Sequence, residues 1–182
     1  MNPKDRDIAN IVLVGLIGTG KTAVGMRLAE MLHMKFVDTD DIIEEDSSMI
    51  ISDIFSKMGE EHFRDLESRA ADKVRKLRRY VIATGGGIVL RERNIQSLRS
   101  TGMIFCLDAT PEVILKRTSQ ETHRPLLKVE DPMGRIREML RIREPFYAKA
   151  DHRIDTSQLT VSQVADRIAG LFTSHFSKDQ DG

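Results

Sequence analysis

The octapeptide Gly15-Leu16-Ile17-Gly18-Thr19-Gly20-Lys21-Thr22 decides the fold, because it has the pattern G-x-x-x-x-G-K-[S/T] between a strand and a helix. An unbroken apolar run at residues 11–14 precedes it and is typical of a strand buried on both faces of a parallel sheet. In such a loop, backbone N–H groups and the helix N-terminus surround phosphates, and the lysine reaches the β and γ phosphates. The pattern predicts nucleotide binding by Gly18, Thr19, Gly20, Lys21, Thr22 and Ala23.

Four later segments have the composition of short strands, and helical patterns lie between and after them. These strand candidates are residues 35–37, 80–83, 103–107 and, more weakly, 153–154. Strands that alternate with helices predict a doubly wound α/β sheet, in which ligands bind beyond the carboxyl ends of the strands. Functional residues are therefore expected directly after each strand.

Composition bounds the class of protein. A chain of 182 residues predicts one domain over residues 1–182. The 28 basic and 28 acidic residues leave no net charge, so we expect no nucleic-acid partner. The longest apolar stretch, residues 11–17, is shorter than the roughly 18 residues of a membrane span, which argues against a membrane partner. The only cysteine, Cys106, cannot form an intrachain disulfide, and a cytoplasmic location is expected.

Three carboxylates follow the second strand candidate, in the sequence Asp38-Thr39-Asp40-Asp41. Aspartate at a helix start is common as a capping residue, and capping alone could explain this cluster. Beside a phosphate-binding loop, however, magnesium needs a carboxylate and an acceptor alcohol needs an oxygen to orient its proton. The sequence predicts Asp38, with Thr22, as a magnesium ligand, and Asp40 as the residue that faces the acceptor.

Glycines and arginines supply the remaining candidates. Gly85, Gly86 and Gly87 follow the third strand candidate, where bare backbone could contact a ligand, although a flexible turn is the alternative. Arg64, Arg124 and Arg143 each lie near a glycine or proline, and Pro145 is expected to break the helix that carries Arg143. A solvated surface position is the ordinary explanation for any single arginine, so their importance depends on whether they converge.

Two charged segments interrupt the alternation of strands and helices. Residues 41–77 show consecutive helical patterns without a strand, which indicates a subdomain. Residues 119–133 contain two prolines and little periodicity, and a polar loop of this length is usually functional or mobile. We interpret the second segment as a lid.

The candidate residues together resemble the shikimate kinase family. The resemblance spans most of the chain and rests on residues 15–22, 38–40, 59–67, 84–87, 124–127 and 143–150. It implies a three-layer fold with a five-stranded parallel sheet and the transfer of the γ-phosphoryl group of ATP to the 3-hydroxyl of shikimate, with Mg²⁺ as cofactor. Shikimate and ATP are then the expected partners, and a monomer is expected.

The same resemblance implies a role for each candidate. Lys21 and Arg124 stabilise the transferring phosphoryl group, and Arg124 is carried by the lid. Asp40 holds the substrate hydroxyls, while Arg64 and Arg143 hold its carboxylate beside the backbone of Gly85, Gly86 and Gly87. Residues 41–77 form the substrate-binding region. Arg117 flanks the adenine, and residues 157–159 are expected opposite it, because the family's proline after the last strand is missing here.

Two other functions remain open at this point. A related kinase of another hydroxy acid, such as gluconate, would share the phosphate-binding loop, although Arg64, Arg143 and the three glycines favour shikimate. A nucleotide-responsive module without catalytic activity is the alternative of another class. A GTPase-like switch would be expected to carry N-K-x-D, and this motif is absent from the sequence.

Overall fold

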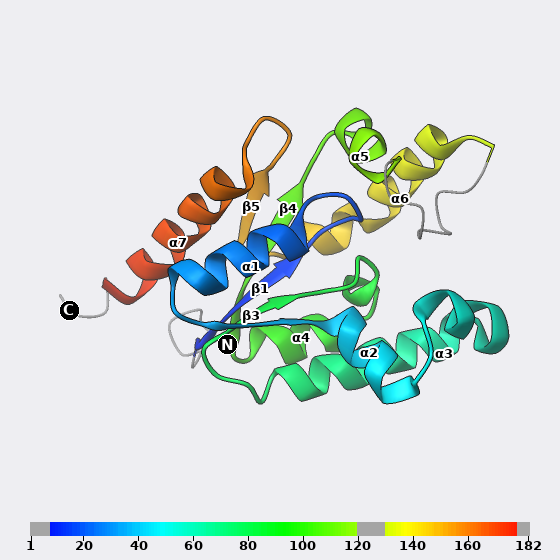
Figure 1. The fold of residues 1–182 in the computed structure, drawn as a ribbon, viewed down its shortest axis with the longest axis horizontal. Coiled ribbons are helices and arrows are strands. Elements are labelled where there is room, and N and C mark those ends of the chain that lie inside the picture. Colours follow the sequence, from blue (N-terminus) through cyan, green and yellow to red (C-terminus); the bar gives the residue numbers. More distant parts are fainter. Residues whose placement is uncertain (1–7, 120–129, 178–182) are drawn as a thin grey trace.

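A five-stranded parallel sheet forms the centre of the protein (Figure 1). The structure, a computed structural model, describes residues 8–119 and 130–177. The strand order is β2-β3-β1-β4-β5, and every neighbouring pair is parallel. The strands are β1 (Asn10–Val14), β2 (Lys35–Asp38), β3 (Tyr80–Ala83), β4 (Gly102–Asp108) and β5 (His152–Asp155). All five strand predictions are confirmed, with ends that differ by no more than one residue.

Helices cover both faces of the sheet and give the three layers that the family resemblance implies (Figure 1). The helical elements are α1 (Lys21–Met31), α2 (Thr39–Ser47), α3 (Ile51–Val74), the short 3₁₀ helix η2 (Ile88–Leu90), α4 (Glu92–Arg99), α5 (Pro111–Thr118), α6 (Pro132–Tyr147) and α7 (Val161–Ser177). One core joins α1 and α7 to one face of the sheet. A second core joins the end of α3, α4 and α6 to the other face.

Helices α2 and α3 carry a small apolar cluster of their own, formed by Ile43, Ile54, Phe63 and Ala70. Both helices project beyond the edge of the sheet in Figure 1. Apart from the first two residues of α2, they lie within the predicted helical region, residues 41–77. Helix α3 is kinked at Gly59, whose φ of 82° favours glycine over any residue with a side chain. The kink separates the first turns of α3 from the part of the helix whose end packs on the sheet through Ala71 and Val74.

Two local expectations about prolines were wrong. Pro145 does not break α6, which continues to Tyr147. A proline in the last turn removes only one helical hydrogen bond, and Pro145 is exposed, so water can bind the orphaned carbonyl. Pro132 and Met133, which the lid prediction included, instead form the first turn of α6 behind the N-cap Asp131. The rest of the lid prediction, including Arg124, falls mostly on residues 120–129, outside the described residues.

Candidate active site

The predicted site residues that the structure describes come together at the carboxyl edge of the sheet. The octapeptide leaves the end of β1, Asp38 ends β2, and the three glycines follow β3. Strand β3 lies between β2 and β1, and its Ala83 pairs with both Asp38 and Leu13. Because parallel strands end at a common edge, their following loops become neighbours.

Close packing around the octapeptide explains its first glycine. Gly15 has a φ of 141°, and a Cβ there would lie 2.3 Å from the backbone oxygen of Leu107 at the end of β4. The Thr19 hydroxyl donates a 2.8 Å hydrogen bond to the Leu16 carbonyl and closes the loop on itself. The loop then enters α1 at Lys21, so the helix N-terminus faces the space that the loop encloses.

Lys21 folds back over this loop. Its Nζ donates to the carbonyl oxygens of Gly15 at 2.9 Å and Leu16 at 3.0 Å. The ammonium group therefore lies beside the backbone that the motif assigns to phosphate binding. A bound phosphate could accept its hydrogen bonds in the same place.

Thr22 and Asp38 form the candidate magnesium site. The Thr22 hydroxyl donates to Asp38 Oδ2 at 3.1 Å, so two oxygen ligands lie next to each other and are accessible to solvent. Within residues 8–119 and 130–177 no group of three or more histidine, cysteine or acidic side chains could hold a metal. A small set of oxygen ligands still fits Mg²⁺, which takes its other ligands from phosphate and water.

Asp40 is held in an unusual environment for a carboxylate. Asp38 caps α2 by accepting a 3.0 Å hydrogen bond from the Asp40 backbone N–H. The Oδ1 atom of Asp40 is buried and has no hydrogen-bond partner among the described residues. Burial and the neighbouring Asp38 raise the pKa of Asp40 to about 7, although Lys21 opposes them. Asp40 is therefore suited to accept a proton or a hydroxyl hydrogen bond near neutral pH.

Arg64 is buried beside the glycine loop. It donates to Glu67 Oε2 at 2.6 Å and to Glu60 Oε1 at 2.7 Å, and a Cβ at Gly87 would lie 2.1 Å from its Nη1. Burial lowers the pKa of Arg64, but the two glutamates outweigh this effect and raise it overall. Burial likewise raises the pKa of Glu67 more than Arg64 lowers it. The guanidinium is thus fixed and charged next to Gly87.

The three glycines connect the candidate residues. A Cβ at Gly85 would lie 2.6 Å from Asp40 Oδ1 and 3.2 Å from Glu67 Oε1, while one at Gly86 would lie 3.0 Å from Arg143 Nη1. Any side chain here would occupy the space between the carboxylates and the arginines. The structure therefore brings Asp40, Arg64 and Arg143 to one glycine-walled place beside the phosphate-binding loop.

Arg117 makes contacts that differ in kind from those expected of an adenine-flanking residue. Its guanidinium donates to the Gly18 carbonyl at 3.3 Å, to Thr156 Oγ1 at 3.0 Å and to the Thr156 carbonyl at 2.8 Å. Thr156 is buried and directly precedes residues 157–159. Arg117 thus joins the octapeptide to the loop after β5, and its contact with adenine stays a prediction.

Sequence reasoning did not assign roles to Glu67, Tyr147 and Thr156. The spacing of Glu60, Arg64 and Glu67 on one helix is a signal for the first, because residues three and four apart share a helix face. Tyr147 and Thr156 reach partners distant in the sequence, Gly86 and Thr19. No local pattern could have predicted these contacts.

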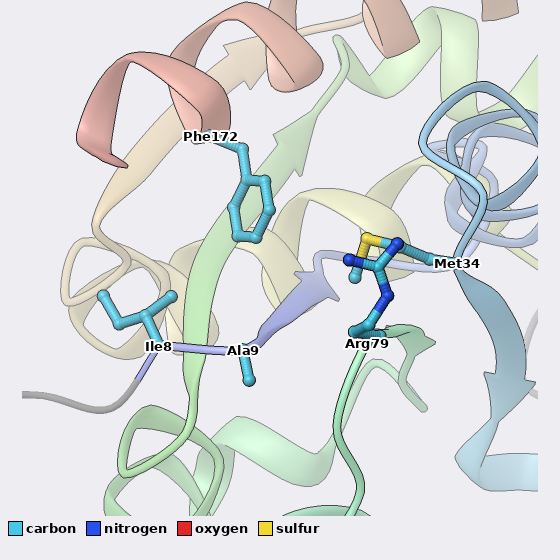
Figure 2. Close-up of a pocket in the computed structure, with 5 residues that line it drawn as sticks. All are labelled: Ile8, Ala9, Met34, Arg79 and Phe172. Carbon is cyan, nitrogen blue, oxygen red and sulfur yellow. The ribbon is translucent and has the colours of Figure 1, made fainter. Parts of the chain in front are cut away.

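A separate pocket lies at the amino edge of the sheet, opposite the candidate active site (Figure 2). Its volume is about 340 Å³, and Ile8, Ala9, Met34, Arg79 and Phe172 line it. Ala9, Met34 and Arg79 immediately precede strands, so this pocket is remote from the phosphate-binding loop. Its lining is mainly apolar and does not gather the polar groups needed for catalysis.

The candidate site and fold agree with those of known proteins. A family model described as shikimate kinase matches residues 17–172. Shikimate kinase from Caldanaerobacter subterraneus subsp. tengcongensis is 52% identical over 159 residues, which cover 87% of this chain and 93% of that protein. Shikimate kinase from Thermodesulfovibrio yellowstonii is also 52% identical, with 87% and 92% covered.

A solved structure shows the same similarity in three dimensions. Shikimate kinase from Acinetobacter baumannii in complex with shikimate has a TM-score of 0.88 and 37% sequence identity, covering 95% of this chain and 98% of that one. The agreement extends over the sheet, the helices and nearly the full length of both chains. With the family model matching most of its residues, the chain belongs to the shikimate kinase family.

Proposed function

We propose that this chain transfers the γ-phosphoryl group of ATP to the 3-hydroxyl of shikimate through the residues at the carboxyl edge of the sheet. Its family members are ATP-dependent kinases with an alcohol acceptor. The observation that carries the residue assignment is the glycine-walled convergence of one buried carboxylate, Asp40, with two arginines, Arg64 and Arg143. A ring with one carboxylate and several hydroxyls needs both kinds of partner.

The octapeptide, with its Lys21, would bind the phosphates of ATP. Lys21 would exchange its bonds to the Gly15 and Leu16 carbonyls for bonds to phosphate oxygens and balance the charge on the transferring group. Thr22 and Asp38 would hold Mg²⁺, which neutralises charge on the phosphates when bound. Lys21 and the N-terminus of α1 would thus supply positive charge on the ATP side of the acceptor.

The acceptor, shikimate, would be bound by Asp40, Arg64 and Arg143. The arginines would bind the shikimate carboxylate and so fix the ring against the three glycines. Asp40 would orient the 3-hydroxyl and accept its proton as that oxygen bonds to the γ-phosphorus and the bond to the ADP oxygen breaks. Its raised pKa matches the acceptance of a proton near neutral pH.

Some of the expected features stay predictions. Arg124, expected at the transferring phosphoryl group, lies outside the described residues, as does most of the lid. The monomeric state and the cytoplasmic location are likewise untested. Among the described residues, no helix combines the length and the apolar character needed to cross a membrane.

The substrate assignment is tested by a panel of acceptors. Purified protein is given ATP and Mg²⁺ with shikimate, gluconate or AMP, and release of ADP is followed. We expect shikimate to be phosphorylated far faster than the others, because paired arginines and a rigid glycine wall suit a ring carboxylate. Comparable turnover of gluconate would reject the assignment, and ATP hydrolysis independent of any acceptor would reject the kinase activity.

The arginine pair gives a separate prediction. Arg64→Ala and Arg143→Ala should each raise the KM for shikimate at least about 30-fold, because removal of one partner from a buried charge pair costs about 2 kcal/mol or more. The KM for ATP should change little. Arg69→Ala is the matched control, since Arg69 is exposed on the same helix as Arg64. If either site variant lost ATP affinity instead, that arginine would belong to the nucleotide site.

A further inference from the structure

Tyr147 is buried at the end of α6 and contacts the glycine loop. Only 1% of its surface is exposed, and its hydroxyl donates a 3.0 Å hydrogen bond to the carbonyl oxygen of Gly86. Burial raises the pKa of this phenol, although the nearby Arg143 guanidinium opposes the effect. The hydroxyl therefore remains protonated and keeps donating at physiological pH.

The hydrogen bond fixes the orientation of one peptide group. The peptide between Gly86 and Gly87 is trans, so its carbonyl and its N–H point in opposite directions. Tyr147 holds the carbonyl toward α6, and the N–H of Gly87 consequently points away from α6. Glycine peptides rotate easily, because no side chain restricts them, so an external hydrogen bond is an effective restraint here.

Tyr147 also lies beside a residue of the proposed carboxylate site. Arg143 precedes it by four residues on α6, a spacing that places both side chains on one helix face. A Cβ at Gly86 would lie 3.0 Å from Arg143 Nη1, and the Arg143 charge lowers the pKa of the Tyr147 phenol. The hydroxyl, the Gly86 peptide and the Arg143 guanidinium therefore form one contiguous group.

We propose that Tyr147 is a positioning residue, whose hydroxyl holds the Gly86 peptide and the Arg143 guanidinium as one unit in the geometry that binds the acceptor carboxylate. The proposal rests on the function proposed above for Arg143. It assigns the Tyr147 hydroxyl a part in recognising the acceptor, which the sequence did not reveal. Tyr147 itself need not touch the substrate.

Tyr147→Phe tests this role, because it removes the hydroxyl and keeps the ring. We compare Tyr147→Phe with the wild type and with the control variant Tyr80→Phe. The quantities measured are kcat, the KM for shikimate, the KM for ATP and the melting temperature. Tyr80, the only other tyrosine, begins β3 at the opposite edge of the sheet. We expect Tyr147→Phe to raise the KM for shikimate about tenfold, because the Gly86 carbonyl loses its hydrogen bond and the peptide is no longer held in place. The KM for ATP should stay within about twofold, and Tyr80→Phe should match the wild type.

A second comparison uses the Arg143→Ala background. There the hydroxyl has lost the guanidinium it positions, so adding Tyr147→Phe should raise the KM for shikimate by less than about threefold. An undiminished tenfold effect in that background would overturn the proposal. An unchanged KM for shikimate in Tyr147→Phe alone would also overturn it, as would an equal rise in the KM for shikimate and the KM for ATP. If Tyr147→Phe failed to fold, the hydroxyl would serve stability, and the proposal would again be overturned. Turnover of shikimate by the wild type separately tests the proposed function.

Discussion

Replacing Asp40 by asparagine should lower the kcat for shikimate phosphorylation about 100- to 1,000-fold while the protein stays folded. Asparagine keeps the shape of the side chain but cannot accept a proton from the acceptor hydroxyl. Steady-state kinetics with circular dichroism would measure both effects. Asp46→Asn is the matched control, since Asp46 is exposed on the same helix and pairs with Lys73. Near-normal turnover of Asp40→Asn would show that another group orients the hydroxyl.

The same variant should be more stable than the wild type, and increasingly so as the pH rises from 5 to 8. The pKa of Asp40 is 3.8 ordinarily and about 7 in the folded protein. Between these values the folded state holds a proton that the unfolded state has released, so the wild type loses stability as the pH rises. Asparagine does not titrate and avoids this loss. Melting temperatures at pH 5 and pH 8, without substrates or Mg²⁺, would reveal the trend, and an equal difference at both values would contradict the buried state of Asp40.

Lys21→Ala should have the second large effect, a fall of about 1,000-fold in kcat/KM for ATP. The ammonium group lies 2.9 Å from the Gly15 carbonyl and 3.0 Å from that of Leu16, so it is already in place at the phosphate-binding loop. Alanine removes this charge without disturbing the apolar core. Lys57→Ala, which removes an exposed lysine that pairs with Asp53, is the control. If Lys21→Ala retained its ATP turnover, the octapeptide would not be the catalytic phosphate site.

Much of the sheet could be predicted because its signals are local. The run at residues 11–14 is apolar at every position, as expected of a strand that the structure buries on both faces. Strand β5 was the weakest prediction, because it lies at the sheet edge and only Ile154 of its four residues is buried. Pro145 misled the prediction of α6, because the cost of a proline depends on its position within the helix.

The candidate site was predictable to the extent that its residues follow strands. Asp38, Asp40 and the three glycines were found because parallel strands deliver their loops to one edge. Other features depend on contacts between elements that are far apart in the chain. These are the hydrogen bonds of Tyr147 and Thr156 and the burial of Glu67. Their roles follow from packing, which no local periodicity records. The hydrogen bonds from Arg117 to Thr156 could not be predicted for the same reason.

The most direct test of the central claim is the identity of the product. The purified protein is incubated with ATP, Mg²⁺ and shikimate, and phosphorus and proton NMR spectra locate the phosphate on the product. We predict one new phosphomonoester, attached to the 3-hydroxyl of shikimate and formed in equal amount with ADP. Phosphate on another hydroxyl, or ADP released with inorganic phosphate and no shikimate ester, would contradict the account.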